Sequence, residues 1–115
     1  MPSISIIGGG NLGTAIAEGL VSKNFCQPQE IIVTRRNVTT LENLAAQGIR
    51  VSNDNALAVQ QTEWVILAIK PFQIAQVLQQ LQQSFTPKHK IISVVTGVWL
   101  NDIQTIVGTT QPVFR

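Results

Sequence analysis

Short apolar runs alternate with longer segments of helical periodicity along this chain of 115 residues. We expect strands at 3–7, 30–34, 49–51, 64–69, 90–95 and 112–115. We expect helices at 11–22, 39–47, 53–60, 71–81 and 100–107. Strands joined by helices of this length form a parallel sheet, because each helix carries the chain back to the edge where the next strand begins. The order of elements therefore predicts one α/β domain over residues 1–115, with a doubly wound parallel sheet.

The spacing of apolar residues predicts which surfaces are buried. The uninterrupted run 64–69 is typical of a central strand that is covered on both faces. The helix after Pro71 is expected to bury one side and to leave an uncharged outer face of glutamines. Its apolar residues are Ile74, Val77, Leu78 and Leu81, and its glutamines are Gln73, Gln76, Gln79, Gln80, Gln82 and Gln83. For the helix at 11–22, the expected buried face is Leu12, Ala15, Ile16, Gly19 and Leu20.

The composition excludes several classes of protein. With 44% apolar and 12% charged residues, the chain can bury a core and is not a solvated disordered segment. Its longest apolar run is far shorter than the ~20 residues that span a bilayer, and no basic segment precedes an apolar one at the start, so neither a membrane partner nor a secretory signal is expected. Eight basic residues against six acidic ones, with no tyrosine, disfavour a nucleic-acid partner. A lone cysteine, Cys26, fits a reducing, cytoplasmic setting.

A glycine-rich loop follows the first expected strand and opens the first expected helix. It matches the pattern G-x-G-x-x-G at Gly8, Gly10 and Gly13. In that pattern the first glycine permits a tight turn, the second lets the backbone approach a pyrophosphate, and the third lets helix and strand pack closely. Asn11 is a candidate for the helix N-cap or for a phosphate donor. A purely structural glycine turn is the alternative, but the strand–loop–helix context favours a Rossmann-type dinucleotide site, whose phosphates would lie at the helix N-terminus.

The end of the second strand indicates which dinucleotide is preferred. A site for NAD places Asp or Glu about 20 residues beyond the loop. Here that position is Thr34, followed by Arg35 and Arg36. Two guanidinium groups can clamp the phosphate that distinguishes NADP, and no carboxylate is present to repel it. We therefore expect NADP (NADPH), with NAD bound at lower affinity; the alternative is that both arginines are solvated surface residues.

The ends of the fourth and fifth strands reach the same edge of the sheet, where ligands of open α/β folds bind. Lys70, after the fourth strand, is expected near the nicotinamide half of the cofactor, unless it only ends a strand and extends into water. Thr96 or Gly97, after the fifth strand, could contact the nicotinamide ring.

Other residue types with catalytic potential give weaker signals. His89 lies between two lysines and is expected to be solvated. Cys26 is expected to be a structural or loop thiol, and Trp64 and Trp99 are expected to pack. The sequence contains neither a Ser/His/Asp arrangement nor a set of metal ligands, so it predicts no metal and leaves the catalytic residue unknown.

Six segments in this order resemble pyrroline-5-carboxylate reductase, and together they extend over nearly the whole chain. They are 6–13, 15–20, 34–35, 48–55, 66–71 and 92–97. Leu12, where methionine is usual in that family, and Trp99, where a small polar residue is common, depart from its pattern.

Members of that family reduce the C=N bond of 1-pyrroline-5-carboxylate with NAD(P)H, in the last step of proline biosynthesis. The resemblance implies that Gly10, Asn11 and Leu12 lie along the pyrophosphate. It implies Arg35 and Asn55 beside the adenosine ribose or its phosphate. It also implies Ala68, Lys70 and Pro71 near the nicotinamide ribose.

The resemblance is to the N-terminal, NADP-binding domain of the family. Because the last strand-like run stops at Arg115, we expect a longer protein, whose helical C-terminal domain would make a homo-oligomer and hold the carboxylate of the cyclic imine acid. Two other functions stay open. One is a related deazaflavin-dependent or β-hydroxyacid-type reductase; the other is a non-catalytic module that senses dinucleotides.

Overall fold

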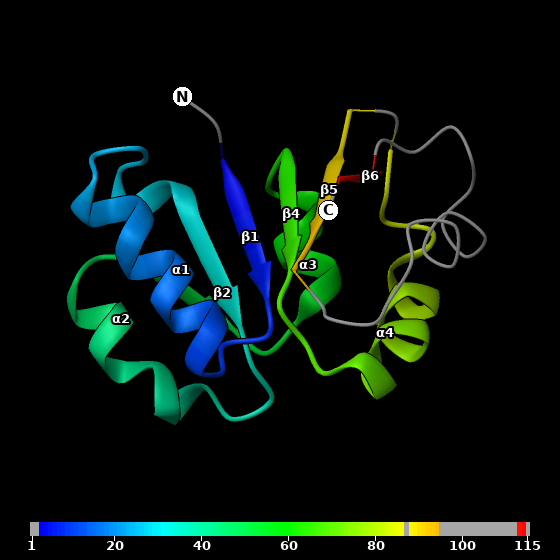
Figure 1. The fold of residues 1–115 in the computed structure, drawn as a ribbon, viewed down its shortest axis with the longest axis horizontal. Helices are drawn as coiled ribbons and strands as arrows, with labels where there is room; N and C mark the ends of the chain where they lie inside the picture. Colours follow the sequence, from blue (N-terminus) through cyan, green and yellow to red (C-terminus); the bar gives the residue numbers. More distant parts are fainter. Residues whose placement is uncertain (1–2, 87, 95–112, 115) are drawn as a thin grey trace.

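The computed structural model describes residues 3–86, 88–94 and 113–114, and its centre is a parallel sheet of six strands (Figure 1). The strands are β1 (Ile4–Ile7), β2 (Ile31–Thr34), β3 (Arg50–Ser52), β4 (Trp64–Leu67), β5 (Lys90–Ser93) and β6 (Val113–Phe114). Their spatial order is β3-β2-β1-β4-β5-β6, and every neighbouring pair is parallel. This is the order of the Rossmann fold, so the predicted fold class is confirmed.

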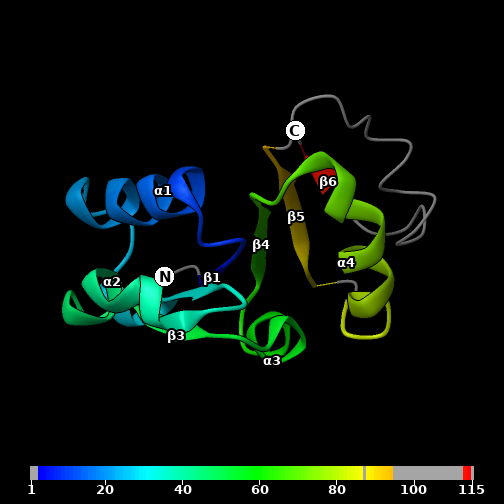
Figure 2. The same cartoon turned by 90° about the horizontal axis from the view of Figure 1, so that it is seen from below.

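Helices cover both faces of the sheet (Figure 2). The α-helices are α1 (Asn11–Ser22), α2 (Glu42–Ala46), α3 (Asn55–Gln60) and α4 (Ile74–Leu81). Three short 3₁₀ helices precede strands or helices: η1 (Pro28–Glu30), η2 (Val38–Leu41) and η3 (Pro71–Gln73).

Two hydrophobic clusters, one on each face, result from the period-2 alternation of side chains along the strands. Ile6 and Ile66 pack with Ala17 of α1 and Leu44 of α2 on one face. On the opposite face, residues such as Leu67 pack with apolar residues of α3 and α4. β4 is accordingly buried on both sides, as predicted for a central strand.

The buried face of α1 agrees with the predicted one only in part. Gly13 and Ala17 are its fully buried residues, whereas Leu12 is 50% exposed and Ala15 and Gly19 are exposed. Ile16 and Leu20 of the predicted face are partly buried and pack against the core, as predicted. Gly13 lies so close to the carbonyl group of Gly8 that only a glycine fits there. By contrast, α4 buries Ile74, Leu78 and Leu81 with Val77 partly covered, as predicted.

Local sequence signals set the ends of the shorter helices. After α2, the N–H of Gly48 donates to the carbonyl of Ala45 at 3.0 Å, and the N–H of Ile49 donates to that of Leu44 at 3.2 Å. With φ of +94° at Gly48, this is the Schellman ending that glycine permits. α3 begins where Asp54 Oδ1 accepts the N–H of Leu57 at 3.1 Å.

The predicted helix at 100–107 lies outside the residues that the structure describes. Within the described ranges, no helix is both long enough and apolar enough to cross a lipid bilayer.

Candidate functional site

A cleft of about 950 Å³ lies at the carboxyl ends of β1, β2, β4 and β5. In Figure 1 the ends of β1, β2 and β4 point to the same lower edge of the sheet. Ten of the residues singled out in the sequence line this cleft: Gly8, Gly10, Asn11, Leu12, Thr34, Arg35, Arg36, Asn55, Ala68 and Lys70. The fold thus brings together segments that are up to 62 positions apart in the chain (Gly8 to Lys70).

The remaining predicted residues lie elsewhere or outside the described residues. Gly13 is buried beneath the loop rather than lining the cleft. Pro71 begins η3, four positions after the last residue of β4. Thr96 and Gly97 lie outside the described residues, as does Trp99.

Each glycine of the G-x-G-x-x-G pattern occupies a distinct environment. Gly8 has φ of +108°, and a Cβ there would lie 2.9 Å from the carbonyl oxygen of Ala68. At Gly13 a Cβ would overlap the carbonyl oxygen of Gly8. At Gly10, in contrast, a Cβ would meet no atom within 4 Å. The first and third glycines are therefore required by the protein's own packing, and the second faces open space where a ligand can approach.

Gly9, which the motif does not include, is also closely packed. A Cβ at this position would lie 2.7 Å from Cδ2 of Leu41 and 3.0 Å from Cγ1 of Val33. The sequence did contain a signal for it, because three consecutive glycines exceed what G-x-G demands. The N–H groups of Gly8 and Gly9 both donate to the carbonyl oxygen of Thr34, at 3.1 and 2.7 Å, so the loop is fastened to the end of β2.

The first turn of α1 faces the cleft without a side-chain cap. The N-cap is Gly10, with extended backbone (φ −77°, ψ −163°), and Asn11 is the first helical residue. The prediction of Asn11 as N-cap is therefore wrong: the chain enters the helix one residue earlier, at a glycine that has no side chain to donate or accept. Because the first N–H groups of a helix have no partner within it, this end of α1 offers hydrogen-bond donors and a positive dipole to an anion.

Arg35 crosses from the end of β2 to the glycine loop. Its Nη1 donates to the carbonyl oxygen of Gly9 at 3.3 Å and to Oγ1 of Thr40 at 3.1 Å. Its backbone N–H donates to the carbonyl of Ser52 at 3.0 Å, which extends the pairing of β2 with β3. The side chain is exposed, yet two hydrogen bonds anchor it. A freely solvated arginine would have no such anchor.

The hydroxyl of Thr34 is buried and unpaired among the described residues. The residue is 1% exposed, and its Oγ1 has no hydrogen-bond partner among the residues that the structure describes. Buried polar atoms in this state are rare, since leaving one unpaired costs about 1–3 kcal/mol. Because Thr34 also lines the cleft, a ligand is a candidate partner for this hydroxyl.

The described lining of the cleft has a strongly one-sided charge. It includes Arg35, Arg36 and Lys70 and contains neither aspartate nor glutamate. The whole chain has a formal net charge of only +2, so basic groups are concentrated at the cleft. An anionic ligand fits this lining best.

Sequence reasoning missed eight lining residues: Ile7, Asn53, Ile69, Gln73, Gln76, Val77, Gln80 and Val94. Three of them belong to the glutamines that were predicted to form an outer face of the helix after Pro71. Gln76 and Gln80 are exposed, as predicted, and Gln73 is half-buried. The periodicity could not show that one edge of this exposed side borders a cleft. Gln73 also accepts the N–H of Lys70 through Oε1 at 3.1 Å.

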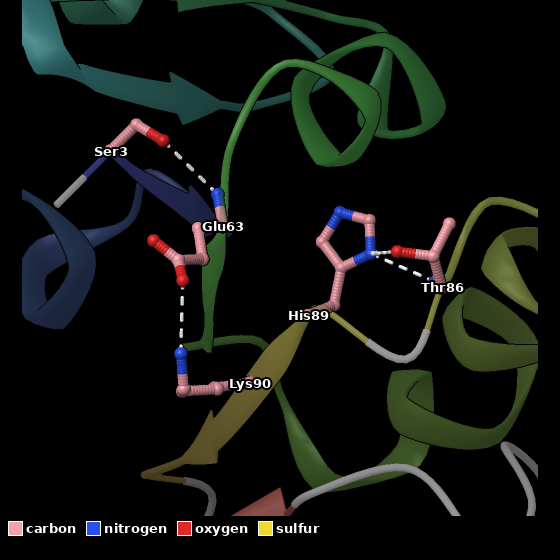
Figure 3. A network of polar contacts seen from close by, with 5 residues as sticks. All are labelled: Ser3, Glu63, Thr86, His89 and Lys90. Carbon is pink, nitrogen blue, oxygen red and sulfur yellow. Dashed lines mark hydrogen bonds and ion pairs between the residues drawn. The ribbon is translucent and has the colours of Figure 1, made fainter.

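His89 is buried, at 5% exposure, and the prediction of a solvated histidine is wrong. Figure 3 shows its ring beside Thr86. Its Nδ1 accepts the N–H of Thr86 at 2.9 Å, and its Nε2 lies 2.7 Å from the carbonyl oxygen of Val59. The two flanking lysines suggested that His89 is exposed, but the turn before β5 directs its ring toward α3, where Val59 lies. His89 precedes β5, at the sheet edge opposite the cleft, so its role is structural.

In the nearby pair of Glu63 and Lys90, Glu63 is exposed and Lys90 is half-buried. Figure 3 shows the two side chains facing each other. Their N–O separation is 3.0 Å, and this hydrogen bond lowers the pKa of the Glu63 carboxyl. The Lys90 ammonium also lies 5.0 Å from the centre of the Trp64 ring, so this tryptophan packs as predicted. Cys26 is buried in the core, and burial raises the pKa of its thiol.

Residues 3–97 match the protein family described as NADP oxidoreductase, coenzyme F420-dependent. The chain belongs to this family. Among its relatives, pyrroline-5-carboxylate reductase 1 of Dictyostelium discoideum is 38% identical over 112 residues, which are 97% of this chain and 20% of the relative. Pyrroline-5-carboxylate reductase 3 of Xenopus laevis is 36% identical over 112 residues, which are 97% of this chain and 41% of the relative.

A comparison with solved structures also finds a pyrroline-5-carboxylate reductase. The pyrroline-5-carboxylate reductase of Coxiella burnetii is 30% identical and has a TM-score of 0.90, over 97% of this chain and 42% of that chain. The resemblance to pyrroline-5-carboxylate reductase is thereby confirmed in sequence and in fold. The chain spans less than half the length of each of these three relatives.

Proposed function

We propose that this chain binds NADPH and is the cofactor-binding domain of a pyrroline-5-carboxylate reductase. The observation that carries the proposal is the cleft itself. A glycine loop at a helix N-terminus forms one side of it, and three basic residues without a carboxylate lie in its described lining. A dinucleotide with an additional phosphate is the ligand whose shape and charge match both features.

Each part of the cleft has a distinct proposed task. The N–H groups at the start of α1 bind the pyrophosphate, with Gly8 and Gly10 shaping the loop and Gly13 setting its distance from the sheet. Arg35 and Arg36 bind the 2′-phosphate of the adenosine ribose. Thr34 and Asn55 offer polar groups to that ribose.

The other half of the cofactor is proposed to lie beyond β4. Leu12 flanks the pyrophosphate, and Ala68, Lys70 and Pro71 lie beside the nicotinamide ribose. Thr96 and Gly97 are proposed contacts of the nicotinamide ring. NADPH supplies the hydride for reduction of a carbon–nitrogen double bond; NADH is proposed to bind with lower affinity, because the arginines then have no phosphate partner.

For the whole protein, we propose reduction of 1-pyrroline-5-carboxylate to L-proline in the cytoplasm, as a homo-oligomer. The pyrroline-5-carboxylate reductases that match this chain are longer, and the matched residues cover 20–42% of their length. Hydride transfer needs the imine held about 3–3.5 Å from the nicotinamide, and the cleft described here is of a size for the cofactor. We propose that a further domain supplies the pocket for the cyclic imine acid.

The family description favours a second candidate, in which the partner of NADPH is the deazaflavin F420. The two candidates differ in the acceptor and not in the cleft. Mixing NADPH with pyrroline-5-carboxylate or with oxidised F420, in the presence of the longer protein, separates them by which acceptor causes NADPH oxidation. We expect pyrroline-5-carboxylate to do so, and no oxidation by the 115-residue chain alone.

Calorimetric titration of the 115-residue chain with NADPH and NADH tests the binding proposal. We expect NADPH to bind about tenfold or more tightly than NADH, since hydrogen bonds to a charged partner contribute about 1.5–3 kcal/mol each before solvent weakens them. Gly10→Val should fold and lose NADPH binding, because its side chain fills the open space beside the loop.

Gly19→Val is the matched control. Gly19 is in the same helix, is exposed, and likewise has no atom within 4 Å of a built Cβ, so this variant should bind NADPH normally. Undiminished NADPH affinity in a folded Gly10→Val chain would contradict the proposed position of the pyrophosphate. Absence of NADPH binding by the wild-type chain would contradict the proposed function altogether.

A further inference from the structure

The guanidinium of Arg35 is held at one nitrogen and open at the other two. Both N–H groups of Nη1 are used, by the carbonyl oxygen of Gly9 at 3.3 Å and by Oγ1 of Thr40 at 3.1 Å. Nε and Nη2 make no hydrogen bond to the part of the chain that the structure describes. Together they form one of the two-donor edges with which arginine grips two oxygens of a phosphate.

The hydroxyl of Thr40 has its direction fixed. It donates to the carbonyl oxygen of Asn37 at 2.8 Å. A hydroxyl has a single proton, and arginine has no acceptor, so towards Arg35 this oxygen acts only as an acceptor. The side chain is therefore oriented by its own turn, whether or not a ligand is present.

The turn that holds Thr40 is itself anchored to the core. Thr40 belongs to η2, and the next residue, Leu41, is 1% exposed and packs against Gly9. Gly9 in turn supplies the second acceptor for Arg35. Arg35 is thus held between two points whose separation is fixed by the packing of Leu41 against the glycine loop.

We propose that Thr40 is a positioning residue that sets the preference for NADPH over NADH. It holds Nη1 of Arg35 so that the edge formed by Nε and Nη2 is presented to the 2′-phosphate. Without the Thr40 hydroxyl, the guanidinium retains only its bond to Gly9 and rotates about it, so the phosphate must first immobilise it. NADH has no 2′-phosphate and is indifferent to this change. The inference rests on the proposed function, since it assumes that the cleft binds NADPH.

Thr40→Val tests the inference, because valine has the shape of threonine without the hydroxyl. We expect the Kd of the 115-residue chain for NADPH to rise about threefold to tenfold, which corresponds to the loss of one ordinary hydrogen bond, and its Kd for NADH to stay within about twofold. Thr40→Ser keeps the hydroxyl and should restore the wild-type ratio of the two constants. Thr40→Ala is a second variant without a hydroxyl and should give the same result as Thr40→Val. Agreement between the two shows that the effect comes from the lost hydroxyl and not from a disturbance of the turn by valine.

Thr39→Val is the matched control. Thr39 is the adjacent exposed threonine of η2, and its hydroxyl donates to Oδ1 of Asn37 rather than contacting Arg35. It should leave the ratio of NADPH to NADH affinity unchanged. An unchanged NADPH affinity in Thr40→Val and Thr40→Ala, or an equal loss for both cofactors, would overturn the role of Thr40 while leaving NADPH binding intact. Failure of the wild-type chain to bind NADPH would overturn the proposed function and this inference with it.

Discussion

Replacing Thr34 by valine should stabilise the chain without ligand and weaken its response to NADPH. Valine keeps the β-branched shape that suits a strand and removes a hydroxyl that is buried without a described partner. An unpaired buried polar group costs about 1–3 kcal/mol, so we expect the free energy of unfolding to rise by about 1 kcal/mol and the Tm by about 4 °C. If the ribose or its phosphate pairs with this hydroxyl, the Kd for NADPH should rise about threefold to tenfold.

Thermal unfolding with and without NADPH measures both effects in one assay. A saturating ligand at about 100 times its Kd stabilises a protein by about 2.7 kcal/mol, and a weaker Kd reduces this at fixed concentration. Thr34→Val should therefore raise the Tm of the free chain and reduce the increase that NADPH causes.

Thr62→Val provides the control of opposite sign. Thr62 is also buried, at 6% exposure, but its hydroxyl donates to the carbonyl of Ala58 at 2.9 Å. Valine there removes a hydrogen bond that is made, so the Tm should fall by a similar amount. A lower Tm for free Thr34→Val would refute the reasoning, since it would mean that the Thr34 hydroxyl is already paired in the folded chain.

Three further substitutions and one reactivity measurement test the packing. His89→Ala should lower the free energy of unfolding by about 2–4 kcal/mol in a urea titration, because it leaves buried partners unpaired, and NADPH affinity should not change if the ring has no part in the cleft. Gly13→Ala should unfold or severely destabilise the chain, as followed by circular dichroism, whereas Gly19→Ala should raise the free energy of unfolding by up to about 1 kcal/mol. Cys26 should react with a thiol reagent far more slowly in the folded chain than in urea, since burial raises the pKa of its thiol; an equal rate in both would contradict its burial.

The element order could be predicted from the sequence because each element contains its own local signal. The glycine loop after a β-branched run predicted the bounds of α1, and Gly48 marked the end of α2. The continuous run 64–69 predicted a buried central strand, and the alternation of runs and helices predicted a parallel sheet. These features depend on residues near one another in the chain, which is why reading the chain locally sufficed.

The errors concern contacts between distant segments. The two lysines beside His89 suggested solvent, but the ring's partner is the carbonyl of Val59, which lies 30 positions earlier. The hydrophobic pattern of α1 correctly indicated Ile16 and Leu20 but did not reveal that Gly13 and Ala17 are buried, because Gly13 is buried by the close approach of the loop at Gly8. The anchoring of Arg35 by Thr40 and Gly9 could not be predicted either, since it requires η2 to pack on the glycine loop.

The two hydrogen bonds that the N–H groups of Gly8 and Gly9 donate to the carbonyl oxygen of Thr34 determine how the glycine loop can move. Both amides are fastened to a strand that lies more than 20 residues further along the chain, and the loop also abuts Ala68 after β4. Local fraying does not break such contacts; separating β1 from β2 does. We therefore expect these two amides to exchange their hydrogens with solvent as slowly as those in the centre of the sheet, through global unfolding. On the timescale of ligand encounter, the loop is then a fixed part of the sheet, and a dinucleotide meets a receptor that is already shaped.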